Sequence, residues 1–132
     1  MLKVIKNQKY QTRVEVERAA RRGRKSAIAS SIRHWQELAT AQVSDIVSVT
    51  CPDLTPDECT LCRRYRHSFC VSCPLYATLG GRRCYEDGEA YSLASTARWC
   101  ARVADTKVQR DLYVKRFRRA AEKMLNTLKS IK

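Results

Sequence analysis

No apolar run in the chain approaches the roughly 20 residues that a membrane-spanning helix needs, so we do not expect a membrane protein. The first seven residues contain no apolar segment of the kind found in signal peptides, and no internal repeat or low-complexity tract is present. These absences favour a cytoplasmic protein. In a reducing compartment, closely spaced cysteines serve as metal ligands or redox thiols more often than as disulfides.

Acidic residues are scarce: 13 Asp and Glu stand against 26 Lys and Arg, which gives a net charge of +13. Residues 1–50 hold ten basic against four acidic residues, residues 51–88 hold five of each, and residues 89–132 hold eleven against four. With 132 residues and a hydrophobic content of 44%, the chain has room for one domain with a modest core. The positive field attracts polyanions and acidic protein surfaces.

Helical periodicity predicts a mainly α-helical fold. Asn7 is a candidate cap for a first helix that ends at Gly23, and Ser26 is a candidate cap for the next. Two apolar stripes with helical spacing comprise Ile28, Ile32, Trp35, Ala39, Val43 and Ile46 in one helix, and Tyr113, Phe117, Ala120, Met124, Leu128 and Ile131 in another. Before the second stripe, Ser92 or Ser95 can start a helix, with a break or a continuation near residue 105. We expect the two striped helices to lie side by side, because each must cover its apolar face.

Five of the seven cysteines lie between residues 59 and 84, as two C-x2-C pairs followed by Cys84. A C-x2-C pair presents two thiolates from one turn, and two such pairs can complete a tetrahedral zinc site. The spacing predicts a zinc-knuckle-like loop within residues 51–90, at one end of the helical pair. The predicted Zn²⁺ ligands are Cys59, Cys62, Cys70 and Cys73, and the alternative set is Cys59, Cys62, Cys73 and Cys84.

Other interpretations of the cluster stay open. An iron–sulfur cluster also uses four thiolates, a C-x2-C dithiol can carry out redox exchange, and His67 is a further possible ligand. Cys51 and Cys100 are more typical of buried thiols. The H-x-E and P-C-x2-C pattern of zinc deaminases is absent, and the zinc is expected to be structural. We therefore predict a protein that is not an enzyme and has no small-molecule substrate.

Three basic groups are candidate contacts for nucleic acid, because arginine binds phosphate and nearby aromatic rings can stack on bases. The predicted contacts are Arg18, Arg21, Arg22, Arg24 and Lys25 in the first group, Arg63, Arg64 and Tyr65 in the second, and Arg116, Arg118 and Arg119 in the third. Membrane-surface binding is less favoured, because no helix pairs a basic face with an exposed bulky apolar one.

The cysteine-rich segment resembles a pattern found in small uncharacterised bacteriophage and prophage proteins. The resemblance rests on Cys59-Thr60-Leu61-Cys62, on Cys70-Val71-Ser72-Cys73-Pro74-Leu75, on the Gly80-Gly81 turn with Cys84, and on the upstream helix with His34-Trp35-Gln36-Glu37-Leu38. It implies a phage protein that acts in a bacterial cytoplasm, where small regulators and inhibitors of host machinery are common.

Together these features predict one domain over residues 1–132. A basic helical arm and helix occupy residues 1–50, the zinc loop residues 51–90, and a basic C-terminal helix residues 91–132. The predicted function is that of a zinc-stabilised, nucleic-acid-associated protein with a regulatory role. The alternative is a phage factor that docks on an acidic surface of a host enzyme or defence complex and inhibits it.

Overall fold

The structure is a computed structural model that describes residues 2–48, 59–65 and 70–131. The part of the chain that it describes is helical and contains no strand, which confirms the predicted mainly α fold. The helices are α1 (Arg13–Arg22), α2 (Arg24–Ala39), α3 (Val43–Ile46), α4 (Thr60–Tyr65), α5 (Pro74–Thr78), α6 (Ala90–Val103) and α7 (Lys107–Lys129).

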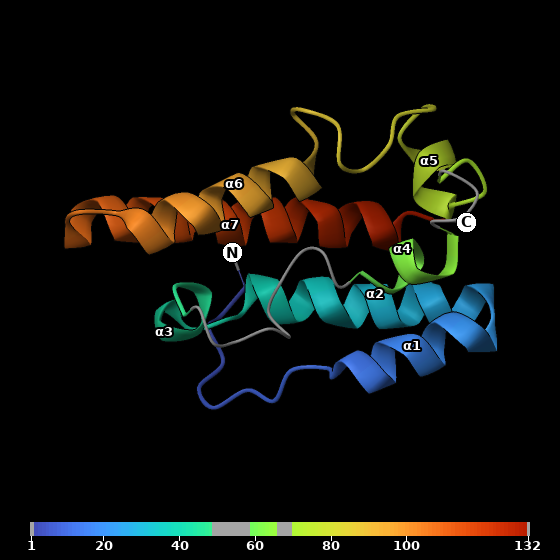
Figure 1. Cartoon of the computed structure of the whole chain (residues 1–132), viewed down its shortest axis with the longest axis horizontal. Coiled ribbons are helices and arrows are strands. Elements are labelled where there is room, and N and C mark those ends of the chain that lie inside the picture. The colour runs from blue at the N-terminus through green and yellow to red at the C-terminus, as the bar shows by residue number, and fades with distance from the viewer. Residues whose placement is uncertain (1, 49–58, 66–69, 132) are drawn as a thin grey trace.

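Helix α7 lies at the centre of the assembly, with α6 packed along one side and α2 along another (Figure 1). Phe117 and Leu125 of α7 and Trp35 and Leu38 of α2 are buried in one shared core. The predicted pairing of the two striped helices is therefore confirmed. Helix α1 covers the outer side of α2, and α5 contacts α7.

No helix within the described ranges is both long and apolar enough to cross a bilayer.

The first helix begins later than the sequence suggested, because its cap is Thr12 and not Asn7. The Thr12 hydroxyl accepts a hydrogen bond from the Glu15 N–H at 3.2 Å, and the Glu15 carboxylate accepts one from the Thr12 N–H at 3.1 Å. This reciprocal pair satisfies two N–H groups that a helix start leaves without partners. Tyr10 consequently lies outside the helix, where its hydroxyl donates to Asp45 Oδ2 at 2.6 Å.

Gly23 ends α1 as predicted, but it also stands directly before α2, so Ser26 is not the cap of that helix. Gly23 has φ of +130° and ψ of −175°, a conformation that is open almost only to glycine. A two-helix corner made at a single residue needs this freedom.

Replacing Gly23 with alanine is expected to destabilise the protein by about 1–3 kcal/mol. The added methyl group would meet no other atom within 4 Å, so the change in free energy would come from the backbone alone. Thermal and urea unfolding measure it. The exposed neighbour Arg22→Ala is the control, and we expect it to change stability by less than about 0.5 kcal/mol. Equal stability of both variants would contradict this account of the corner.

The predicted helix over the stripe of residues 28–46 is wrong in one respect, because it breaks into α2 and α3 after Ala39. The Thr40 hydroxyl donates to the Gln36 carbonyl at 2.8 Å, and the Thr40 carbonyl accepts from the Ile5 N–H at 2.9 Å. The next carbonyl, of Ala41, accepts from Arg118 of α7. These donors replace the backbone N–H groups that would bond to the same carbonyls if the helix continued.

Helix α6 begins at Ala90, earlier than Ser92 or Ser95 would have placed it. The Ser92 hydroxyl donates instead to the Tyr85 carbonyl at 2.6 Å. The open question near residue 105 is resolved as a break. Helix α7 starts anew at Lys107, where Thr106 accepts from the Gln109 N–H at 3.1 Å.

Candidate metal centre and basic surfaces

Both C-x2-C pairs stand beside a short helix. Cys59 directly precedes α4, and Cys73 is the residue before Pro74, the first residue of α5. The Cys73 N–H donates to the Cys70 carbonyl at 3.0 Å, which closes the second pair into a tight turn. Cys70 has φ of +69°, in the left-handed region that residues other than glycine seldom adopt. The turn therefore holds Cys70 and Cys73 in a defined relative position.

The five clustered thiols are neighbours in space. The pKa of Cys59 is raised well above its usual range, first by the thiol of Cys62 and then by burial. The pKa of Cys62 is raised to about 12, because the lowering effect of Cys59 is outweighed by the thiol of Cys84 and by burial. Burial raises the pKa of Cys73 to about 11, and the charge of Cys70 adds to this. Cys84 therefore belongs to the cluster, and both predicted ligand sets remain open.

The environment of Cys59 supplies hydrogen-bond donors to its sulfur. The Ser31 hydroxyl lies 3.5 Å from Cys59 Sγ and accepts from the Leu61 N–H at 3.1 Å, so its own proton is available for the sulfur. The buried indole N–H of Trp35 forms no hydrogen bond within the described ranges, yet it lies close enough to lower the pKa of Cys59. Donors favour the thiolate over the thiol. A thiolate with these neighbours is what a metal ligand requires.

In the described part of the chain, no three cysteine, histidine or carboxylate groups converge at coordination positions. The six described cysteines are free thiols, and Cys51 and the possible ligand His67 lie outside the described residues. The donor set nevertheless fits zinc, because five thiols are clustered and the buried Trp35 N–H, which forms no hydrogen bond within the described ranges, acts on Cys59. Cys100 lies apart, half-buried on α6.

The cysteine segment links the two halves of the fold. Helix α4 packs on α1 and α2, whereas α5 packs on α7 (Figure 1). The α4 end is fixed by a polar contact in which the hydroxyls of Thr60 and Ser30 lie 2.6 Å apart, and Ser30 donates to Gln11 Oε1 at 2.7 Å. The described part of the cysteine segment thus lies at one end of the bundle (Figure 1).

The chain matches no protein family, no curated protein and no solved structure. The resemblance of its cysteine pattern to phage proteins therefore stays a prediction, and its function has to be inferred from the chemistry of its own surfaces.

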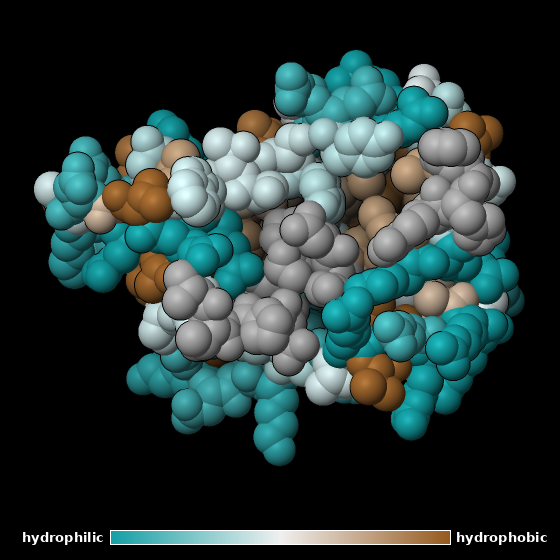
Figure 2. Space-filling model, viewed as in Figure 1, coloured by the Kyte–Doolittle hydropathy of each residue, from teal (hydrophilic) through white to brown (hydrophobic). Residues whose placement is uncertain are grey.

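The first basic group lies at the corner between α1 and α2. All five of its members are exposed, and Figure 2 shows strongly hydrophilic side chains gathered over this region. We call Arg18, Arg21, Arg22, Arg24 and Lys25 the corner patch.

The second basic group is engaged within the fold. Arg64 Nη1 donates to the Ala20 carbonyl at 2.7 Å, and its guanidinium lies 5.5 Å from the centre of the Tyr65 ring. Arg63, Arg64 and Tyr65 are all half-buried on α4. Arg64 and Tyr65 thus hold α4 against α1, and the Tyr65 ring already has a cation stacked on it.

The third basic group divides between two roles. Arg116 and Arg119 are exposed on α7, but Arg118 is half-buried and donates from Nε and Nη2 to the Ala41 carbonyl at 3.1 and 2.7 Å. Burial lowers the pKa of Arg118. No spacing in the sequence could have revealed this role, because it depends on where the end of α2 meets α7.

Replacing Arg118 with glutamine is expected to destabilise the protein by about 1–3 kcal/mol, since it leaves a buried carbonyl without its charged donor. The adjacent Arg119→Gln removes the same charge from an exposed position and is the matched control. Urea unfolding of the two variants measures the difference. If both unfold at the same midpoint as the parent protein, Arg118 does not hold the end of α2.

The sequence alone did not reveal the side chains that surround Cys59 in the candidate metal centre. Trp35 was assigned to the core stripe alone, and Ser31 was given no role. The signal for Ser31 was its position, four residues before Trp35 and three after Ile28, which places a hydroxyl on the inward face of α2.

Proposed function

We propose that this protein binds nucleic acid through the corner patch and that a structural zinc ion held by the cysteine cluster stabilises its fold. The observation that supports nucleic-acid binding is that three exposed arginines of the patch, Arg18, Arg21 and Arg22, form no ion pair within the described residues. In the described ranges, the ion pairs of the protein use Arg13, Arg33, Arg82, Lys107 and Arg110, and none involves Arg18, Arg21 or Arg22. The positive charge of these three arginines is therefore available to an external polyanion.

The geometry of the corner suits a phosphate backbone. Arg18, Arg21 and Arg22 are spaced i, i+3 and i+4, so they share one face of α1, opposite the buried Val16 and Ala20. The turn at Gly23 brings the first residues of α2 next to them. Several guanidinium groups within one corner can contact successive phosphates, and each can bind bidentately. The corner patch contains no aromatic side chain on which a base could stack. This favours binding to the phosphate backbone without sequence preference.

The zinc proposal rests on the clustered thiols and on the donors around Cys59. Zinc would neutralise the thiolates that burial otherwise disfavours, and the Ser31 and Trp35 groups would donate to the metal-bound sulfur. With four sulfur ligands no coordination position is left for water. We therefore propose that the protein is not an enzyme. We also propose a bacteriophage origin and a role in the bacterial cytoplasm, on the cysteine pattern alone.

A salt titration of binding tests the nucleic-acid proposal. The protein is mixed with labelled duplex DNA, duplex RNA and single-stranded DNA. Affinity is measured by fluorescence anisotropy between about 50 and 400 mM salt, a range over which the Debye length shortens about threefold. We expect log affinity to fall by about 0.9 per phosphate contacted on duplex DNA, with little dependence on base sequence. Absence of binding at the lowest salt would refute the proposal while leaving the metal centre untouched.

A further inference from the structure

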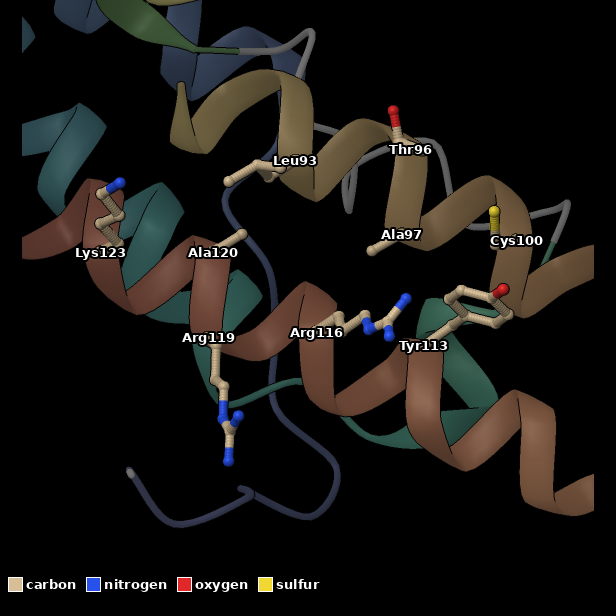
Figure 3. Close-up of a pocket in the computed structure, with 9 residues that line it drawn as sticks. All are labelled: Leu93, Thr96, Ala97, Cys100, Tyr113, Arg116, Arg119, Ala120 and Lys123. Atoms are coloured by element: carbon tan, nitrogen blue, oxygen red, sulfur yellow. The ribbon is translucent and has the colours of Figure 1, made fainter. Parts of the chain in front are cut away.

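A groove of about 330 Å³ runs between α6 and α7 on a side that no described helix covers. Its lining comes from one edge of each helix: Leu93, Thr96, Ala97 and Cys100 of α6, and Tyr113, Arg116, Arg119, Ala120 and Lys123 of α7. In Figure 3, Ala97 and Ala120 point toward each other across the gap and Arg116 reaches along it. The floor is apolar, the rim is cationic, and none of the lining residues is acidic.

The α6 side of this groove is an apolar helix face that no other helix of the described residues covers. Leu93, Cys100 and Val103 follow one another at helical spacing, and the side chains of Leu93 and Val103 are 47% and 54% exposed. Trp99 lies on the same half of the helix and is 62% exposed. An exposed aromatic residue beside aliphatic ones is typical of protein interaction surfaces.

We propose that the α6–α7 groove binds an acidic amphipathic α-helix of a partner protein. The lining residues of α7 span about 15 Å at 1.5 Å per residue, which equals two to three turns of a docked helix. Apolar side chains at i, i+3 or i+4, and i+7 of that helix would fill the floor. Glutamate or aspartate at its flanks would meet Arg116, Arg119 and Lys123.

The same lining is less suited to nucleic acid. A base would need an open ring on which to stack, but the Arg116 guanidinium already lies 5.3 Å from the centre of the Tyr113 ring. A phosphate backbone would use the cations and leave the apolar floor exposed to water. The groove thus differs in kind from the corner patch, which has charge but no apolar floor.

The test uses a fluorescent 15-residue peptide with leucines on one helical face and glutamates on its flanks, and a scrambled peptide of identical composition that lacks the apolar face. We expect the amphipathic peptide to bind at least about tenfold more tightly than the scrambled one, because charge alone would attract both. Amide chemical-shift changes should concentrate on α6 and α7. Equal binding of the two peptides would overturn the proposal.

Matched variants assign the binding to the groove. Leu93→Ser and Arg116→Gln should each weaken binding about tenfold or more. Val108→Ser and Arg102→Gln remove an exposed apolar residue and an exposed arginine outside the groove and should change affinity less than about twofold. Circular dichroism and zinc content of all four should match the parent protein. Unchanged affinity in Leu93→Ser would refute the groove as the site.

Two other occupants are outcomes of the same experiment, and either would overturn the proposal. Displacement of the peptide by duplex DNA would place the groove within the nucleic-acid interface. A concentration-dependent dimer that Leu93→Ser dissociates would identify a second copy of the chain as the occupant. Replacing Arg18, Arg21 and Arg22 with glutamine should leave specific peptide binding intact. Either proposal, for the groove or for the corner patch, can therefore be refuted while the other stands.

Discussion

Replacing Cys62 with serine is expected to abolish zinc binding and to destabilise the protein by about 4 kcal/mol or more, as the loss of a structural metal does. Cys62 lies among the clustered thiols, since Cys59, Cys70 and Cys84 all act on its pKa. Purified parent protein should contain about one zinc per chain and be colourless. Metal analysis and thermal melts with and without a strong chelator measure both effects.

The control for this variant is Cys100→Ser, because Cys100 is also half-buried but lies outside the cluster. It should retain its zinc and melt close to the parent protein. The chelator should lower the melting temperature of the parent and of Cys100→Ser, and it should have no further effect on Cys62→Ser. A parent protein whose melt does not respond to chelation would refute the structural zinc site. A brown protein with visible absorption would indicate an iron–sulfur cluster instead.

Cobalt substitution identifies the fifth, non-ligating cysteine. Tetrahedral Co²⁺ with four thiolates absorbs strongly in the visible range, and the spectrum changes when one sulfur is lost. Single serine variants of Cys70, Cys73 and Cys84 should therefore differ, with one of them leaving the spectrum unchanged. The structure keeps Cys84 within reach of Cys62, so the result decides between the two ligand sets.

Replacing Arg18, Arg21 and Arg22 together with glutamine is expected to weaken duplex binding on the order of a hundredfold at 0.1 M salt. Each lost phosphate contact should reduce the slope of log affinity against log salt by about 0.9. The loss should be similar for unrelated sequences, because the corner patch offers no group positioned to read bases. Fluorescence anisotropy across a salt series measures both quantities.

A matched control tests whether this loss of affinity follows from net charge alone. Replacing Lys3, Lys6 and Lys9 with glutamine removes the same three charges from the exposed N-terminal arm. We expect this variant to lose less than about tenfold in affinity, through the general field of the protein alone. If both triple variants weaken binding equally, the interface is diffuse and the corner patch is not the site.

The sequence was sufficient to predict features that depend on one helix or one residue. The apolar stripes around Trp35 and Phe117 identified the two helices that form the core, because helical spacing alone selects the buried face. Gly23 ended the first helix for a local reason of backbone conformation. The spacing of the cysteines brought the candidate metal ligands together in a segment without helical periodicity.

The sequence did not predict contacts between segments that lie far apart in the chain. Arg118 looked like any other exposed arginine of α7, and only the fold places the Ala41 carbonyl beside it. Leu93 and Cys100 have the spacing of an apolar helix face, but α7 covers the adjacent face that carries Ala94 and Ala101. A hydrophobic stripe predicts that a helix face needs covering, and it does not say whether this chain or another molecule supplies the cover.

The central position of α7 has a consequence for how the protein is made. Helices α2, α5 and α6 all pack on α7, yet all three precede it in the sequence. During synthesis they leave the ribosome before the surface that buries them exists. The α6–α7 hairpin, joined by residues 104–106, can form quickly from local contacts, whereas the α2–α7 contact must close a long loop. The nascent chain therefore exposes the apolar faces of α2, α5 and α6 that pack on α7 until translation has passed α7.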